Sequence, residues 1–147
     1  MAEPGPARGG GGEGASVLAL MPAAVLIFLV LGALAVDSAA VFLAQRELAN
    51  VAVAAANDAV AAVDVGRYYG DGTFRLDTVR VQQVAEETVA RRGLAHLEGV
   101  SAVATVQGDA VEVTVRARVD HIFSGAVPGG PDRADVAATA VADAIRR

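Results

Sequence analysis

Residues 15–36 form an apolar run of 22 residues that contains no charged side chain. A helix rises about 1.5 Å per residue, so this run would be about 33 Å long and would cross a hydrocarbon core of about 30 Å. Its Val, Leu, Ile and Phe residues give a summed insertion free energy of about −4 to −7 kcal/mol. The first charged residue after the run, Asp37, stands at the boundary, where it costs little. The run therefore predicts a membrane span.

Two other structures are compatible with an apolar run near an N-terminus. One is a buried helix of a soluble protein, but such runs are usually shorter. The other is a cleaved signal peptide, which has an apolar region of about 7 to 15 residues and a small-x-small cleavage site. Ala33-Leu34-Ala35 matches that site, although such matches are common in a chain so rich in alanine. The membrane span is the favoured interpretation.

The composition excludes several kinds of chemistry. All 12 basic residues are arginine, so the chain has no lysine for a phosphate-binding loop, a Schiff base or a Ser-Lys dyad. There is no cysteine, which excludes disulfides, thiolate metal sites and catalytic thiols. The net charge of −5 argues against nonspecific binding of nucleic acid. No cofactor is expected.

The apolar run divides the N-terminal part of the chain into three segments. Residues 1–14 carry two prolines and four consecutive glycines, which predict a flexible leader. Pro22 lies inside the run and either bends the helix or marks its first regular turn. Beyond Val36 no helix breaker occurs until Gly66, so we expect the helix to continue beyond the membrane through residues 37–63, to about Val63.

This extension is amphipathic. Its polar side consists of Arg46, Glu47, Asn50, Asn57, Asp58 and Asp64. Its apolar side consists of Val41, Leu48, Val51, Ala52, Ala55, Ala59 and Val63. Because the apolar side is mostly alanine, a core face of the same molecule is favoured over an intermolecular coiled coil.

Residues 64–147 are predicted to form a small α+β domain outside the membrane. The turn-rich segment 66–72 carries Tyr68 and Tyr69, which are either a partner contact or a cover for the edge of a small core. A second helix is expected from Thr78 to Arg92, with Asp77 as its N-cap and Gly93 at the C′ position.

The sequence after the second helix alternates with the period of β-strands. Residues 100–107 and 111–119 each present one apolar face, and Gly108-Asp109 fits a two-residue hairpin turn. The alternation slips at His121-Ile122-Phe123, which indicates a bulge or a strand end before the loop 124–131. Residues 134–144 alternate again, and their alanine content also permits a helix. A third strand is favoured because a two-stranded hairpin covers its apolar face poorly.

Candidate catalytic and metal-binding residues are few. His96 and His121 lie on different predicted elements, and neither belongs to a metal-binding motif. Glu86, Glu87, Asp58 and Asp64 would need a pocket that the sequence does not reveal. The serines Ser16, Ser38, Ser101 and Ser124 lack the GxSxG context of a nucleophile. We therefore expect a non-enzymatic protein with no catalytic, cofactor or metal site.

The N-terminal part of the chain resembles the Flp pilus-assembly TadE/TadG-like family of type IV pilin-like membrane proteins, particularly its actinobacterial members. The resemblance covers about residues 13–60: Glu13-Gly14, the apolar run with Leu20-Met21-Pro22, and the segments 36–37, 41–48 and 54–59. It implies candidate leader processing between Gly14 and Ala15. Processed members carry a glutamate five residues after the glycine, where this chain has Ala19, and TadG-like members commonly lack it.

The resemblance implies a pilin-like fold and a minor pilin-like or accessory role in a Tad/Flp-type pilus or secretion system. The short N-terminal tail would lie in the cytoplasm and the C-terminal domain outside the cytoplasmic membrane. Expected partners are lipid, other pilin-like or secretion-system membrane proteins, and a second copy of the chain. Gly32, Ala33 and Ala35 are candidate residues for close helix packing. The alternative is a membrane-tethered ligand-binding or sensory domain that uses Tyr68, Tyr69 and the loop 124–131.

Overall fold

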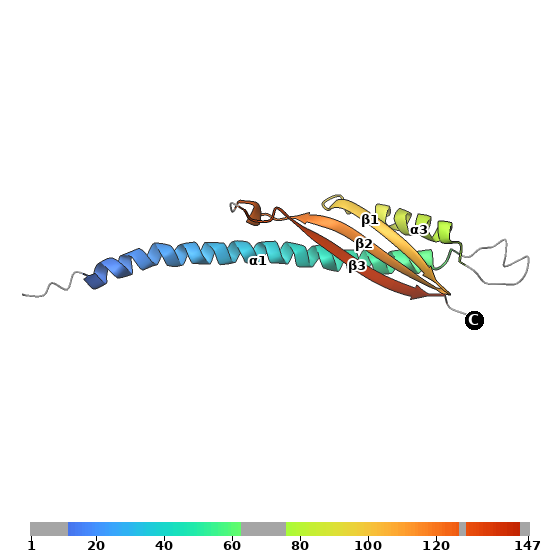
Figure 1. The fold of residues 1–147 in the computed structure, drawn as a ribbon, viewed down its shortest axis with the longest axis horizontal. Coiled ribbons are helices and arrows are strands. Elements are labelled where there is room, and N and C mark those ends of the chain that lie inside the picture. The colour runs from blue at the N-terminus through green and yellow to red at the C-terminus, as the bar shows by residue number, and fades with distance from the viewer. Residues whose placement is uncertain (1–11, 63–75, 127–128, 145–147) are drawn as a thin grey trace, which may run out of the picture.

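The computed structural model describes residues 12–62, 76–126 and 129–144 of the chain. Within these residues the order of elements is a long helix α1, a shorter helix α3, two strands β1 and β2, a 3₁₀ turn η1 and a third strand β3. Figure 1 shows the sheet and α3 alongside the C-terminal half of α1, while the N-terminal half of α1 extends away from them. The α+β arrangement of a long apolar helix, a second helix and a three-stranded sheet is confirmed.

Helix α1 spans Gly12–Ala59 as one continuous element of 48 residues. It begins three residues before the predicted start at Ala15, so residues 12–14 of the expected leader are helical. Pro22 lies inside the helix and does not mark its first turn. The helix ends in hydrogen bonds between residues three apart, which are tighter than those of an α-helix. The N–H groups of Ala61 and Ala62 donate to the carbonyls of Asp58 and Ala59. The helix therefore stops four residues before Val63, which lies outside the described residues.

Helix α3 spans Thr78–Arg91 and has the caps that its sequence predicts. The Asp77 carboxylate accepts the backbone N–H groups of Val79 and Arg80 at 3.0 and 3.2 Å. At the other end, Gly93 takes a φ of 68°, the left-handed conformation that suits glycine after a helix. Val81, Ala85, Thr88 and Val89 form its buried face.

The three strands form an antiparallel sheet in the order β1-β2-β3, with β1 Glu98–Gln107, β2 Ala110–Asp120 and β3 Arg133–Asp143. Gly108, with a φ of 68°, makes the tight turn of the predicted hairpin possible. Residues 134–144 form a strand through Asp143, as favoured, because β3 pairs with β2 along its whole length from Arg133 to Asp143. Strand β2 ends at Asp120, where the alternation slips, and η1 follows at Ser124–Ala126.

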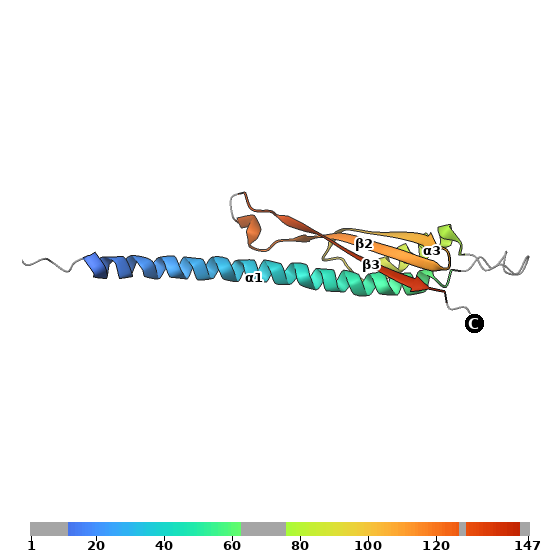
Figure 2. The same cartoon turned by 60° about the horizontal axis from the view of Figure 1, so that its bottom comes forward.

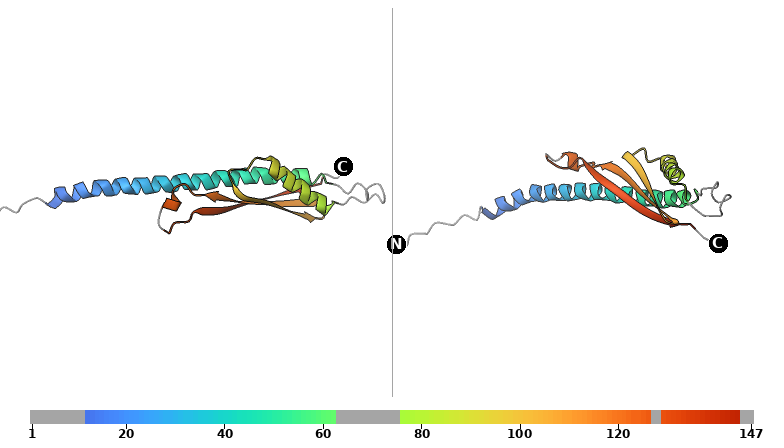
Figure 3. Two further views of the ribbon diagram at one scale, coloured as in Figure 1. Left: turned by 90° about the horizontal axis from the view of Figure 1, so that it is seen from above. Right: turned by 45° about the vertical axis from the view of Figure 1, so that its right-hand side comes forward.

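The core lies between the inner face of the sheet, α3 and the C-terminal half of α1, and Figures 2 and 3 show this layering from three further directions. The largest fully buried side chains are Leu48, Val81, Val111, Val113 and Val115. The predicted apolar side of α1 is buried at Leu48, Val51, Ala52, Ala55 and Ala59. The interpretation of this side as a core face of the same molecule is confirmed, and its alanines let the sheet approach the helix closely.

Candidate functional site

The N-terminal half of α1 is an exposed apolar surface. From Leu20 to Leu34 nearly every large apolar side chain is more than half exposed, and Phe28 is 74% exposed. Among the described residues, one helix, α1, is long enough and apolar enough to cross a membrane. A core helix of a soluble protein would be mostly buried, whereas almost none of this segment is. Its length, composition and exposure are consistent with a single membrane-spanning helix near the N-terminus.

The candidate packing residues of this segment differ in their surroundings. A side chain added at Gly32 would meet no atom within 4 Å, so this face of the helix is open. Ala35 is exposed, but Ala33 is half-buried and lines the same groove as Phe123, which comes from the segment after β2. Gly32 and Ala35 therefore remain available for an approaching helix, and Ala33 is partly occupied by the chain itself.

The other two predicted sites are the leader-processing bond and the tyrosine pair. The bond between Gly14 and Ala15 lies within α1, two residues from its start. Tyr68 and Tyr69 lie outside the described residues.

Asp37, the first residue after the apolar run, binds a distant part of the chain. One oxygen of its carboxylate accepts the backbone N–H groups of Ile122 and Phe123 at 2.7 and 3.0 Å. The other oxygen accepts the N–H of Ser124 at 2.7 Å and the Ser124 hydroxyl. Asp37 is only 3% exposed, yet it is fully satisfied by these bonds. It fixes the segment after β2 against the helix at the end of the apolar run.

The same contacts set the protonation of Asp37. The hydrogen bond from the Ser124 hydroxyl is the largest effect, and together with the three backbone N–H groups it lowers the pKa of Asp37 from 3.8 to about 2, against the opposing effect of burial. Hydrogen bonds to a carboxylate favour its charged form. Asp37 is therefore ionised at neutral pH and acts as a structural acceptor.

Asp37, His121 and Ser124 line one pocket and are the residue types of a serine hydrolase triad. Their hydrogen bonds do not fit that chemistry. The Ser124 hydroxyl donates to Asp37, and His121 Nδ1 lies 3.0 Å from the carbonyl oxygen of Pro131. A nucleophilic serine needs a hydrogen bond to its base, and no hydrogen bond between Ser124 and His121 is found among the described residues. The hydrogen bonds from Ser124 to Asp37 instead hold the loop after β2 against α1.

The other candidate titratable residues that the structure describes are also dispersed, and Asp64 lies outside the described residues. His96 Nε2 lies 2.9 Å from a Glu47 carboxylate oxygen on the surface, far along the chain from His121. Asp58 accepts a hydrogen bond of 2.9 Å from the buried Thr88 hydroxyl, which joins α3 to α1. Within the described ranges no three His, Cys, Asp or Glu side chains are placed to hold a metal ion.

Gln82 covers part of the free edge of β1, a contact that the sequence did not suggest. Its side-chain nitrogen donates to the Ala102 carbonyl at 2.9 Å, and its side-chain oxygen accepts the Ala104 N–H at 2.7 Å. The amide thus takes the place of a neighbouring strand at an edge that would otherwise expose its backbone. It also joins α3 to the sheet.

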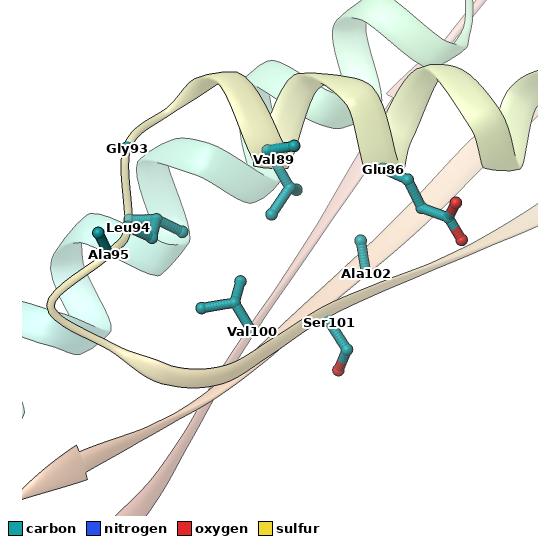
Figure 4. A pocket seen from close by; sticks show the side chains of 9 residues that line it. Glu86, Val89, Gly93, Leu94, Ala95, Val100, Ser101 and Ala102 are labelled. Carbon is teal, nitrogen blue, oxygen red and sulfur yellow. The ribbon is translucent and has the colours of Figure 1, made fainter.

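A pocket of about 530 Å³ lies beside this contact, between the end of α3 and the start of β1. Figure 4 shows Val89 and Val100 facing each other across it, with Leu94 at one end and Glu86 at the other. The pocket is mostly apolar and has few polar groups that converge on one point. It is a candidate ligand site by shape and does not contain a catalytic arrangement.

No family model matches the chain, and neither the curated proteins nor the solved structures contain a significant match to it.

Proposed function

We propose that the chain is a non-enzymatic, single-pass membrane protein that serves as a minor pilin-like or accessory component of a Tad/Flp-type pilus or secretion system. The short N-terminal tail lies in the cytoplasm, the apolar half of α1 spans the cytoplasmic membrane, and the α+β domain lies outside. The domain associates with other membrane proteins or with a second copy of the chain.

The observation that carries this proposal is the division of α1 into two halves. From Leu20 to Val36 the helix exposes its large apolar side chains in every direction, while the C-terminal half contributes Leu48, Val51 and five alanines to the core. Water is a poor solvent for the first half, and a bilayer of about 30 Å matches its length. A helix that is both a membrane span and the spine of a small sheet domain supports a pilin-like role.

Gly32 supports association within the bilayer. Nothing lies within 4 Å of the position that its side chain would occupy, and Ala35 lies nearby on the exposed surface. Small residues let two membrane helices approach closely, which replaces the hydrophobic effect as the source of helix association in lipid. The mechanism proposed for the protein is therefore lateral packing of α1 against another helix.

Disulfide crosslinking tests this packing directly, because the chain has no native cysteine. Gly32→Cys expressed in membranes is expected to form a disulfide-linked dimer, or a crosslink to a neighbouring membrane protein that carries a cysteine-reactive probe. Val30→Cys is the matched control, since it is exposed and lies about 160° around the helix from position 32 and about 140° from position 35 at 100° per residue. Equal crosslinking at both positions, or none at Gly32→Cys, would refute the packing.

The mature N-terminus tests how the chain is processed. Mass spectrometry that finds Ala15 at the terminus would support prepilin-type cleavage, which requires the first turn of α1 to open around the Gly14–Ala15 bond. An intact leader would indicate a signal anchor. A terminus at Val36 would mean that the apolar run is a signal peptide, and it would end the proposal of a membrane-anchored protein.

A membrane-tethered ligand-binding domain is the second candidate, and the pocket between α3 and β1 favours it. Under this function the domain would be a monomer in membranes and would bind a small, mostly apolar ligand near Val89 and Val100. Val100→Phe would fill the pocket and abolish ligand binding, whereas pilin-like association through α1 would be unchanged by it. Crosslinking through Gly32→Cys and ligand binding sensitive to Val100→Phe therefore distinguish the two functions.

A further inference from the structure

The segment that follows β2 exposes two large apolar side chains that are neighbours in the chain. Ile122 is 63% exposed and Phe123 is 45% exposed, while the preceding apolar residues of β2 are buried. No strand geometry explains this exposure, because β2 ends at Asp120. The two residues form an apolar tip, defined here as Ile122-Phe123, on the loop between β2 and β3.

Asp37 fixes the level of this tip along α1. Because its carboxylate accepts the N–H groups of Ile122 and Phe123 at 2.7 and 3.0 Å, the backbone of the tip cannot lie more than a few ångström from the end of the apolar run. Figure 1 shows the loop next to the middle of α1, at the end of the sheet that points toward the N-terminus of the helix. The tip therefore lies at the level where α1 would leave the hydrocarbon.

The tip is continuous with the exposed surface of the helix. Phe123 lines a shallow apolar groove with six residues of the run, namely Phe28, Leu29, Val30, Gly32, Ala33 and Val36. The groove has a volume of about 470 Å³ and lies between the tip and the last turns of the apolar segment. No polar side chain lines it, so the tip and the apolar run form one continuous apolar surface.

Three charged side chains at the base of the same loop pair with one another. Arg133 donates to Asp120 at 2.9 Å and lies 3.4 Å from Glu98. If the tip contacts lipid, the charges of these residues therefore stay paired, and none of them is moved out of water alone.

We propose that Ile122-Phe123 inserts into the outer boundary of the bilayer beside α1, so that the domain contacts the membrane at a second point. This inference rests on the proposed membrane insertion of α1. The headgroup layer is about 5–8 Å thick on each side of the hydrocarbon, which matches the reach of an isoleucine or phenylalanine side chain from a backbone held at Asp37. Aromatic and aliphatic side chains are favoured at this boundary. The occupant of the surface is lipid, and a second protein is not required.

Tryptophan fluorescence provides the test, because the chain contains no tryptophan. Four single-tryptophan variants of the full chain would be placed in phosphatidylcholine vesicles, with and without bromine on the acyl chains. Phe123→Trp reports on the tip and Phe28→Trp on the span. Val141→Trp reports on an exposed position of β3 that lies about 26 Å along the strand from Arg133, at 3.3 Å per residue. Ile122→Trp serves as a second probe of the tip.

The proposal predicts that brominated lipid lowers the emission of Phe123→Trp and Ile122→Trp and leaves Val141→Trp unchanged. The emission of both tip variants should also shift to shorter wavelength in vesicles. Phe28→Trp should be quenched as well, since it lies deep in the span.

Three outcomes would overturn the proposal. Quenching of Phe28→Trp without quenching of the tip would show an inserted span whose domain stands clear of the lipid. A short-wavelength emission of the tip without quenching by brominated lipid would assign the tip to a contact with a second copy. Absence of quenching at Phe28→Trp would refute membrane insertion itself, and the second contact with it.

Discussion

Asp37 and Ser124 stand 87 residues apart in the chain, yet both the backbone N–H and the hydroxyl of Ser124 donate to the Asp37 carboxylate. This contact joins the end of the apolar run to the loop between β2 and β3. It holds the loop one turn before Ala40 and Val41, where α1 begins to pack against the core, and Ala44 is the first buried apolar residue of the helix.

Replacing Asp37 is expected to release the loop. Asp37→Ala removes every acceptor for the N–H groups of Ile122, Phe123 and Ser124, which would then exchange with solvent faster than in the unaltered chain. Hydrogen exchange of the chain in detergent micelles measures this directly. Ser124→Ala is the matched control, since it removes only the hydroxyl donor and should have a smaller effect. Equal exchange rates in Asp37→Ala and the unaltered chain would mean that the loop is held by other contacts.

The anchor should also depend on pH, with a defined sign. The pKa of Asp37 is lowered from 3.8 to about 2 in the folded chain, so its contribution is fully present above pH 3.8 and is lost as the pH falls toward 2. Exchange of the Ser124 amide should therefore accelerate in this range after correction for the intrinsic rate. Asp37→Asn has no carboxylate to protonate and should lack this step. A step of the same size in Asp37→Asn would assign the transition to other groups.

Gln82 should stabilise the chain through its two hydrogen bonds to β1. Gln82→Ala leaves the Ala102 carbonyl and the Ala104 N–H without this partner, and a loss of about 1–3 kcal/mol in the free energy of unfolding is expected. Gln83→Ala changes an exposed glutamine one position along the same helix and should alter the free energy by less than about 0.5 kcal/mol. Chemical denaturation followed by circular dichroism compares the two. Equal losses would rule out a specific role for the edge contact.

Leu48 should be the most sensitive position of α1 outside the apolar run. It is fully buried against the sheet, so Leu48→Ala creates a cavity and is expected to cost about 2–5 kcal/mol. Leu43→Ala makes the same chemical change at a position that is 62% exposed and should cost less than about 1 kcal/mol. The same denaturation measurement applies. Similar costs at both positions would contradict the packing of the sheet on this face of α1.

Local patterns predicted most of the fold. The helical period of 3.6 residues located the buried side of α1 at Leu48, Val51 and Ala55. The alternation of apolar and polar residues, with a period of two, located β2 and β3. Asp77 and Gly93 predicted the ends of α3 within one residue, because capping depends on neighbours in sequence.

The candidate site was less accessible to such patterns. In the sequence, Asp37 is only a charged residue at the end of the apolar run. None of its neighbours in the chain indicates a hydrogen bond to Ser124. Gln82 and the exposed Gln83 are likewise indistinguishable in the sequence, and only the position of α3 against the edge of β1 separates them. Contacts of this kind depend on how elements pack, which a periodicity does not encode.

The continuity of α1 from the apolar run into the core has a mechanical consequence. No loop separates the two halves, and the sheet is held to the second half by buried side chains as well as by Asp37. A rotation of the first half about its own axis must therefore turn the outer face of the sheet by the same angle. Pro22, which leaves one backbone carbonyl without its helical donor, lies on the far side of Asp37 from the sheet. Bending at Pro22 would tilt the sheet and the second half of α1 together as one rigid unit.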